Sequence, residues 1–324
     1  MWRKIDYYCF LGTSGYATAA KYYISALKNK WDIKIIPLDF NRIRATRRKD
    51  TIDIYHCVPH LYHRFKRSRP SIGFATFENI KVPDSWISLL KENNVIVSPS
   101  KFNQKSFPTS EYFPHCLDMS LWNKKIGPII KRSSFTFLFL GTWKKRKGYE
   151  LLLQAFSEEF KHDKRVKLLI KTSGKKPSFF GERIEIVTKN IPENQMPKFI
   201  KSADCLVSPT LGEGFGLPGL QAMAVEVPVI ISDWSGCQDY ANEKTAFLLH
   251  PASFKKISRL DDVSQYKDLE WPVFSMEELK EKMRIVVEDK RLRAEKAQKA
   301  YDFVHERFSF DVVRKRFEEI VTKL

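Results

Sequence analysis

The residues best suited to chemistry lie in one short segment of the chain, 213–230. It reads Glu-Gly-Phe-Gly-Leu-Pro-Gly-Leu-Gln-Ala-Met-Ala-Val-Glu-Val-Pro-Val-Ile. Gly214 and Gly216 leave the backbone uncovered, and Pro218 suits the first turn of a helix. The first N–H groups of such a helix lack partners within it and therefore favour phosphate. With Glu213 in front of this turn, the pattern predicts a site for a phosphorylated ligand.

Gln221 lies on the predicted helix, eight positions after Glu213. Its side-chain amide has an oxygen that accepts and a nitrogen that donates hydrogen bonds, and it carries no charge. Such a group suits hydroxyls. The segment therefore favours a ligand that carries both phosphate and hydroxyl groups.

The whole segment resembles the signature of the family-four (group 1) retaining glycosyltransferases, which have the GT-B fold. That signature has two glutamates separated by seven residues, and here Gln221 stands at the second position. The resemblance implies that Glu213 holds a sugar hydroxyl and that Gln221 lies by the nucleotide ribose. It also implies that the donor meets the backbone of four residues: Gly214, Phe215, Gly216 and Leu217.

A basic loop at 141–148 reads Gly-Thr-Trp-Lys-Lys-Arg-Lys-Gly. A run of this kind is most often a solvated surface loop. Because it follows a predicted strand, it also resembles the family's basic loop, in which Lys147 and Arg146 would neutralise the donor's diphosphate. Thr142 stands where the family usually has an arginine, and we expect it among the donor-binding residues.

Three further candidates lie in the first half of the chain. The turn 12–16, Gly-Thr-Ser-Gly-Tyr, joins a predicted strand to a helix. The resemblance implies that the Gly15 backbone approaches the donor's phosphate and sugar, although an ordinary tight turn is the alternative. Glu78 ends a predicted strand where relatives have a histidine or an acid beside the sugar, with loop capping as the alternative. The motif Pro-His-Cys-Leu-Asp at 114–118 resembles one that supports the family's hinge.

Apolar runs alternate with helical patterns along the chain and predict an α/β protein with doubly wound parallel sheets. Strands are expected at 7–11, 33–38, 52–58, 71–77, 95–98, 135–140, 166–170, 184–187, 205–207 and 229–232. Helices are expected after the 12–16 turn and at 150–156, 196–200, 276–287, 292–305 and 310–324, the last with Ser309 as N-cap. Residues 251–272 show weak periodicity and predict a loop insertion.

A break near residues 124–128 suggests two domains, as expected for 324 residues. We predict an acceptor domain at 1–127 and a nucleotide-sugar donor domain at 128–307, both Rossmann-like. The resemblance implies that the two domains face a central cleft. It also implies that the last helix, 308–324, packs back on the first domain.

The composition is that of a packed globular protein, with 43% hydrophobic residues. No apolar run reaches the roughly 18 residues of a membrane span, and no signal sequence is apparent. The five cysteines are scattered and favour a reducing compartment. We expect a cytoplasmic protein, with peripheral contact to an anionic membrane as an option.

We expect no metal and no cofactor. His56, His60 and His63 lie close in sequence, but Pro59 interrupts any helix that would align them, and no acid or cysteine completes the set. The chain also has no Asp-x-Asp pair to hold a divalent ion on a diphosphate. Lysine, arginine and helix N–H groups would then meet the leaving group's charge.

The net charge of +18 allows several classes of anionic partner. Basic residues cluster at Arg42, Arg44, Arg47, Arg48 and Lys49, and again at Arg64, Lys66, Arg67 and Arg69. Solvated surface is their usual place, and an anionic acceptor or membrane face is the alternative. Nucleic acid is disfavoured, because no known binding motif accompanies the charge.

These features and the resemblance lead to one functional prediction. The protein is expected to move a sugar from a nucleotide-diphosphate sugar, such as a UDP- or GDP-sugar, to a hydroxyl acceptor on a glycan, lipid or protein, with retention of configuration. The alternative is an inactive nucleotide-sugar-binding or scaffold protein of the same fold. A basic nucleic-acid-binding protein ranks third.

Overall fold

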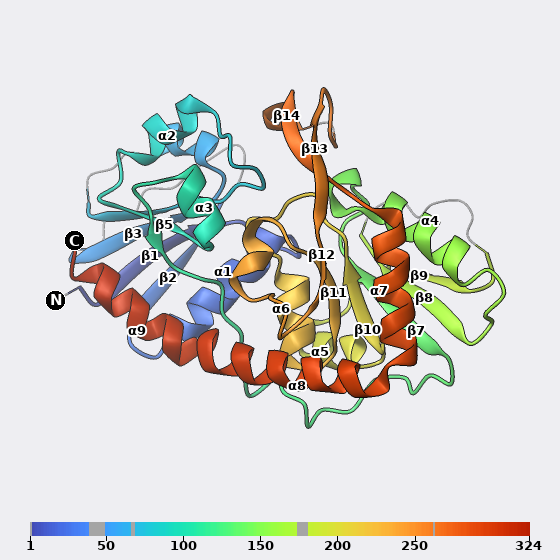
Figure 1. Cartoon of the computed structure of the whole chain (residues 1–324). Helices are drawn as coiled ribbons and strands as arrows, with labels where there is room; N and C mark the ends of the chain where they lie inside the picture. Colours follow the sequence, from blue (N-terminus) through green and yellow to red (C-terminus); the bar gives the residue numbers. More distant parts are fainter. Residues whose placement is uncertain (1, 39–48, 66–68, 174–180, 262) are drawn as a thin grey trace. The chain divides into compact units, whose positions relative to one another are not determined.

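The computed structural model describes residues 2–38, 49–65, 69–173, 181–261 and 263–324. The chain divides into two compact units, Met1–Asp118 with Arg307–Leu324, and Met119–Glu306. Each unit contains one parallel six-stranded sheet with helices, which confirms the predicted α/β class (Figure 1). No helix in the described ranges has both the length and the hydropathy to cross a bilayer.

The sheet of the first unit has the strand order β2-β1-β3-β4-β5-β6. Its strands are β1 (Lys4–Cys9), β2 (Asp32–Pro37), β3 (Thr51–His56), β4 (Ser71–Phe74), β5 (Val95–Ser98) and β6 (Glu111–Tyr112). The helices of its first 118 residues are α1 (Gly15–Leu27), α2 (Asp84–Leu90) and α3 (Lys101–Ser106). Strands β3, β4 and β5 are buried along their whole length, as expected for parallel strands covered on both faces.

The last helix, α9 (Phe310–Val321), belongs to the first unit although it follows the second in sequence. Arg314 on α9 donates a hydrogen bond from Nε to the carbonyl of Ala26 at 2.8 Å. The Ser309 side chain accepts from the N–H of Val312 at 3.4 Å, so the predicted N-cap is confirmed. The chain leaves and re-enters this unit at adjacent points, because Leu117 of the 114–118 motif forms a parallel bridge with Ser309.

A buried cluster of histidines and tyrosines lies in the first unit. His56 Nδ1 is 2.9 Å from Tyr7 Oη, and His115 Nδ1 is 2.9 Å from Tyr23 Oη. Burial lowers the pKa of His115 to about 3. It also lowers the pKa of His56, and His115 adds to that shift. Both imidazoles are therefore neutral in the folded protein at neutral pH.

This cluster predicts acid sensitivity of the first unit. Below pH 6.5 the unfolded chain binds protons at His56 and His115 that the folded chain does not, so stability falls as pH falls toward 3. The slope approaches about 1.4 kcal/mol per pH unit for each histidine. Amide hydrogen exchange in β1 and β3 at pH 7.5, 6 and 5 measures it. His115→Gln should roughly halve the slope of stability against pH. The control is His162→Gln, which changes an exposed histidine of the other unit and should leave the slope unchanged. An unaltered slope in His115→Gln would contradict the assignment to the buried histidines.

The sheet of the second unit has the strand order β12-β11-β10-β7-β8-β9. Its strands are β7 (Phe135–Leu140), β8 (Val166–Lys171), β9 (Ile184–Val187), β10 (Cys205–Ser208), β11 (Val229–Ser232) and β12 (Phe247–Leu249). The helices of this part of the chain are α4 (Tyr149–Glu159), α5 (Met196–Ile200), α6 (Leu217–Ala224), α7 (Met276–Glu288) and α8 (Lys290–Arg307). The chain runs outward from β7 to one edge and from β10 to the other.

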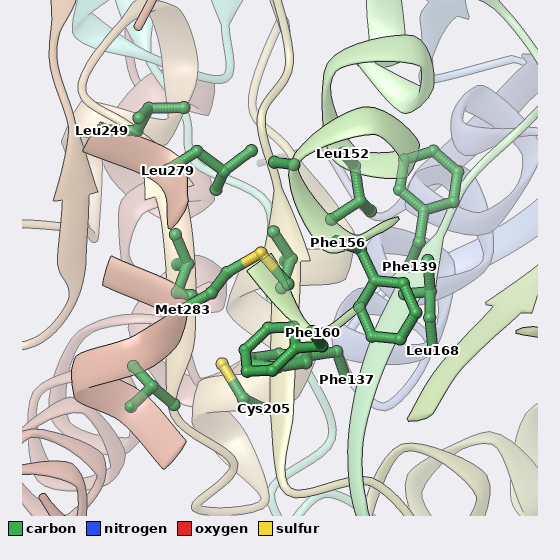
Figure 2. Packing of buried hydrophobic residues seen from close by; sticks show 14 of the residues in the cluster. Phe137, Phe139, Leu152, Phe156, Phe160, Leu168, Cys205, Leu249, Leu279 and Met283 are labelled. Atoms are coloured by element: carbon green, nitrogen blue, oxygen red, sulfur yellow. The ribbon is translucent and has the colours of Figure 1, made fainter. Parts of the chain in front are cut away.

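The core of the second unit joins the sheet to α4 and α7 (Figure 2). Phe137 on β7 packs against Phe160 with ring centroids 5.7 Å apart, and Phe156 of α4 lies 5.6 Å from Phe160. Met283 of α7 belongs to the same cluster and is fully buried. The cluster also includes Cys205 and Val207 of β10, so it spans the two central strands of the sheet.

The segment 251–272 is not the loop insertion that its weak periodicity predicts. Its two ends pair as an antiparallel hairpin of β13 (Pro251–Ile257) and β14 (Leu269–Phe274), drawn in orange in Figure 1. The pattern is hidden because β13 is exposed on both faces. Pro272 also lies within β14, where a two-stranded ribbon tolerates it because one side of each strand has no partner.

Candidate functional site

The two central strands of the second sheet, β7 and β10, end beside each other. They are neighbours in the sheet, but the chain continues from them in opposite directions. Such a switch point opens a crevice at the carboxyl ends of the strands, where α/β proteins bind ligands. The basic loop 141–148 follows β7 and the loop 209–216 follows β10. The strand order therefore places both predicted loops at the same position of the sheet.

Glu213, Lys147 and Arg146 meet at this switch point. The Lys147 Nζ lies 2.5 Å from Glu213 Oε1, and the Arg146 guanidinium lies 3.5 Å from Glu213 Oε2. The three side chains are only 11–17% exposed. Residues that are 66 positions apart in sequence thus form one partly desolvated ion cluster.

The cluster has an excess of positive charge. Burial alone would raise the pKa of Glu213, but Lys147 and Arg146 outweigh it and hold the pKa of Glu213 below its ordinary value. The carboxyl is therefore ionised at neutral pH, and one negative charge faces two positive ones. A partly buried site with surplus cationic charge attracts an anion such as a phosphate.

Backbone contacts lock the two loops together. Arg146 accepts at its carbonyl from the N–H of Leu211 at 2.7 Å and from Thr210 Oγ1 at 3.2 Å. Its guanidinium donates to the carbonyl of Gly212. Gly148 has φ +73°, and a Cβ at this position would lie 1.9 Å from the carbonyl oxygen of Pro209. The close approach of the loops therefore requires glycine at 148.

The turn before α6 is held from the segment Ser235–Asp239. The N–H of Glu213 donates to Ser235 Oγ at 2.9 Å, and the Glu213 carbonyl accepts from the N–H of Gly236 at 3.0 Å. Gly216, with φ +91°, accepts at its carbonyl from Tyr240 Oη at 2.5 Å. Sequence reasoning missed Ser235 and Tyr240, because they lie about 20 residues downstream and carry no local motif.

The remaining predicted residues of this unit lie at or near the turn. Helix α6 begins at Leu217 with Pro218 in its first turn, as predicted. Gln221 lies on α6 and is 5% exposed. Thr142 is exposed on the basic loop, where its carbonyl accepts from the N–H of Lys144 at 2.8 Å. Gly214, Phe215 and Leu217 are buried beside Glu213.

The other predicted residues, Gly15 and Glu78, belong to the first unit. Gly15 is exposed and begins α1, after Ser14, whose side chain accepts from the N–H of Ala17 at 3.2 Å. Glu78 is half-buried and follows β4. Tyr16 Oη donates to the carbonyl of Thr76 at 3.2 Å, and its pKa is raised by burial and further by the Glu78 charge. Gly15 and Glu78 thus lie after the carboxyl ends of β1 and β4.

His56 lies in the buried core, and one residue of the basic clusters, Arg69, pairs with buried carboxylates. His56 stacks on Phe74 with centroids 4.1 Å apart, and the described ranges hold no group of three or more potential metal ligands. Arg69, expected on the solvated surface, instead pairs with the buried carboxylates of Asp6, at 3.0 Å, and Asp53. Six other residues of these clusters lie outside the described residues: Arg42, Arg44, Arg47, Arg48, Lys66 and Arg67.

The fold of the second unit is Rossmann-like, and Lys147, Arg146 and Glu213 form an ion cluster at the switch point of its sheet. Residues 134–261 match the family model of glycosyl transferases group 1. The chain is 25% identical over 230 residues to the capsular polysaccharide biosynthesis glycosyltransferase CapM of Staphylococcus aureus, covering 68% of this chain. It is 28% identical over 85 residues to the putative teichuronic acid biosynthesis glycosyltransferase TuaC of Bacillus subtilis, covering 26% of this chain and 22% of TuaC. The match spans 59% of the length of CapM.

Solved structures agree with the fold. HepE of Anabaena, in complex with UDP and glucose, has a TM-score of 0.73 at 12% identity, covering 99% of this chain and all of HepE. Sucrose-phosphate synthase of Thermosynechococcus elongatus has a TM-score of 0.73 at 14% identity, covering 99% of this chain and 98% of the enzyme. Residues 134–261 are thus similar to the group 1 glycosyltransferases, and the fold of the chain is GT-B, as the sequence predicts.

Proposed function

We propose that the protein transfers a sugar from a nucleotide-diphosphate sugar to a hydroxyl acceptor, with retention of configuration and without a metal. The observation that carries the proposal is the convergence of Lys147 and Arg146 on Glu213 at the switch point. Two cations at this point suit a diphosphate, and a buried carboxylate beside them suits a sugar hydroxyl. The turn before α6 presents backbone N–H groups to the same ligand.

In the proposed reaction the bond between the sugar's anomeric carbon and the diphosphate oxygen breaks, and a bond to the acceptor oxygen forms on the same face. The acceptor's proton passes to the departing diphosphate, so no protein nucleophile is required. Negative charge grows on the diphosphate as the bond breaks. Lys147, Arg146 and the N–H groups before α6 stabilise that charge in place of a divalent ion.

Glu78 and Gly15 of the first unit and Thr142 and Gln221 of the second complete the proposed set of donor residues. HepE has been solved with UDP and with UDP-glucose, which supports a uridine nucleotide as a first donor to test. The names of CapM and TuaC, which mention capsular polysaccharide and teichuronic acid biosynthesis, support a glycan as the acceptor class.

Product analysis tests the proposal. The protein is incubated with UDP-, GDP- and ADP-sugars and a panel of glycan and lipid-linked acceptors, with and without EDTA. We expect one donor class to release its nucleoside diphosphate, EDTA to leave the rate unchanged, and proton NMR to show an α-linked product from an α-linked donor. Binding without turnover for every pair of donor and acceptor would favour an inactive sugar-nucleotide-binding protein. The residues that motivate this alternative are Gln221 and Thr142, which stand where the family has a glutamate and an arginine. Inversion of configuration would contradict the proposed chemistry.

Gln221→Glu is expected to tighten nucleotide binding. A carboxylate accepts from two ribose hydroxyls, whereas the Gln221 amide has one accepting oxygen. A hydrogen bond to a charged group contributes about 1.5 to 3 kcal/mol, so we expect Kd to fall about tenfold. Calorimetric titration measures it, with Gln154→Glu at an exposed position of α4 as the control. An unchanged or weaker affinity would contradict the proposed contact between Gln221 and the ribose.

A further inference from the structure

The side chain of Asp261, in the loop between β13 and β14, contacts the main chain of the basic loop. Its Oδ1 accepts from the N–H of Lys145 at 2.6 Å, and its Oδ2 accepts from the N–H of Arg146 at 3.1 Å. These two residues begin the 3₁₀ turn Lys145–Lys147, where the first N–H groups have no partner within the turn. Asp261 therefore caps this turn from more than 100 residues away in sequence.

Buried side chains hold Asp261 in place. Leu260 is 3% exposed and Tyr266 is 5% exposed, so both sides of the hairpin loop are anchored. The Tyr266 ring packs edge-on against Trp271 of β14, with centroids 5.1 Å apart. The Arg146 guanidinium lies 5.8 Å from the centroid of the same ring. The hairpin thus supports both the backbone and the side chain of Arg146.

The capping contact leaves the cationic side chains directed to the site. Asp261 binds main-chain N–H groups of the turn, while the Arg146 and Lys147 head groups face Glu213. A carboxylate at the start of a turn also offsets the partial positive charge of its N–H groups. The turn is therefore stabilised without an acidic side chain occupying the place of the ligand.

We propose that Asp261 is a positioning residue for the diphosphate. By fixing the Lys145–Lys147 turn it holds Arg146 and Lys147 ready to meet the two phosphates. Without this cap the turn samples several conformations. Ordering it when the ligand binds costs conformational entropy, and this cost lowers the affinity. The inference rests on the proposed function, since it assigns the ligand of Arg146 and Lys147.

Asp261→Asn tests the inference with little change of shape. Asparagine tolerates the left-handed φ of +57° at this position, but its amide has one accepting oxygen for two N–H groups. Asp268 is a matched control, because it is an exposed aspartate of the same hairpin loop with φ +58°. In calorimetric titrations we expect Asp261→Asn to raise the Kd of the bound nucleoside diphosphate about tenfold, and Asp268→Asn to change it less than about twofold.

Two further readouts separate positioning from a general structural effect. The corresponding nucleoside monophosphate should lose less affinity in Asp261→Asn than the diphosphate. Amide hydrogen exchange at Lys145 and Arg146 in the unliganded protein should quicken, while exchange in β7 stays unchanged. An equal Kd in Asp261→Asn, or equal losses for the monophosphate and the diphosphate, would overturn the inference.

Failure of the proposed function has a different signature. In that case the wild-type protein binds none of UDP, GDP, ADP and dTDP. The proposed role of Asp261 is then also wrong, because no diphosphate binds to Arg146 and Lys147. If the wild type binds one of them and Asp261→Asn binds it equally well, the proposed function stands and only the role of Asp261 is lost.

Discussion

Lys147→Met is expected to lower the rate of sugar transfer by about a hundredfold to a thousandfold, the usual cost of losing one group that stabilises transition-state charge. Methionine keeps the length and apolar part of the side chain but removes the ammonium that lies 2.5 Å from Glu213 Oε1. The diphosphate would then meet one side-chain cation, Arg146, in place of two. The loss should appear in kcat as well as in KM, because the charge grows during the reaction.

The same change should also weaken the folded state. Glu213 would be left buried with Arg146 3.5 Å away as its remaining cation of the cluster. Breaking a buried pair by removing one partner costs about 3 kcal/mol or more, and the pKa of Glu213 should rise. The double variant Lys147→Met with Glu213→Gln removes both partners, so it should recover stability without recovering transfer.

Lys144→Met is the control for this prediction, because Lys144 is an exposed cation of the same loop. We expect it to retain transfer within about threefold of wild type, as surface charges away from a ligand contribute little. Steady-state kinetics and thermal unfolding measure all four proteins. Transfer by Lys147→Met at the level of Lys144→Met would show that the ion cluster does not meet the donor.

Gly148→Ala is expected to have the largest effect on stability. Alanine is strained at φ +73°, and its Cβ would lie 1.9 Å from the carbonyl oxygen of Pro209. The backbone of one loop must move, which would also separate Arg146 from its partners at Leu211 and Thr210. We expect a loss of about 3 kcal/mol or more in the free energy of unfolding, with loss of nucleotide binding.

Gly127→Ala is the matched control, since Gly127 lies in the same unit and no atom beyond its chain neighbours lies within 4 Å of a Cβ placed there. Its free energy of unfolding should stay within about 0.5 kcal/mol of wild type. Denaturant titration followed by tryptophan fluorescence compares the two variants. If Gly148→Ala unfolds at the same denaturant concentration as Gly127→Ala, the two loops are not locked as described.

Several elements were predictable because their sequence pattern is local. The buried apolar runs of β5 (Val95–Ser98) and β7 (Phe135–Leu140) have the predicted bounds, since strands covered on both faces are apolar along their length. The same holds for the N-cap at Ser309, which depends on the next three residues. By contrast, the hairpin of β13 and β14 was missed because β13 is exposed on both faces and therefore has no alternating apolar pattern.

The candidate site was predictable in part for the same reason. The glycine turn at Gly214–Leu217 and the cations Arg146 and Lys147 belong to short motifs, so the sequence shows them. That Lys147 and Glu213 touch depends on β7 and β10 being neighbours in the sheet, which is a property of the strand order. Asp261, Ser235 and Tyr240 support the loops through long-range hydrogen bonds, and a lone residue of a common type has no sequence signature.

We expect the donor's diphosphate to bind at the cluster of Lys147, Arg146 and Glu213. A crystal structure of the protein with the nucleoside diphosphate that it binds best tests this most directly. Phosphate oxygens are expected within about 3 Å of Lys147 Nζ and the Arg146 guanidinium, with further contacts to N–H groups before α6. A diphosphate bound elsewhere, with both cations still closed on Glu213, would contradict it.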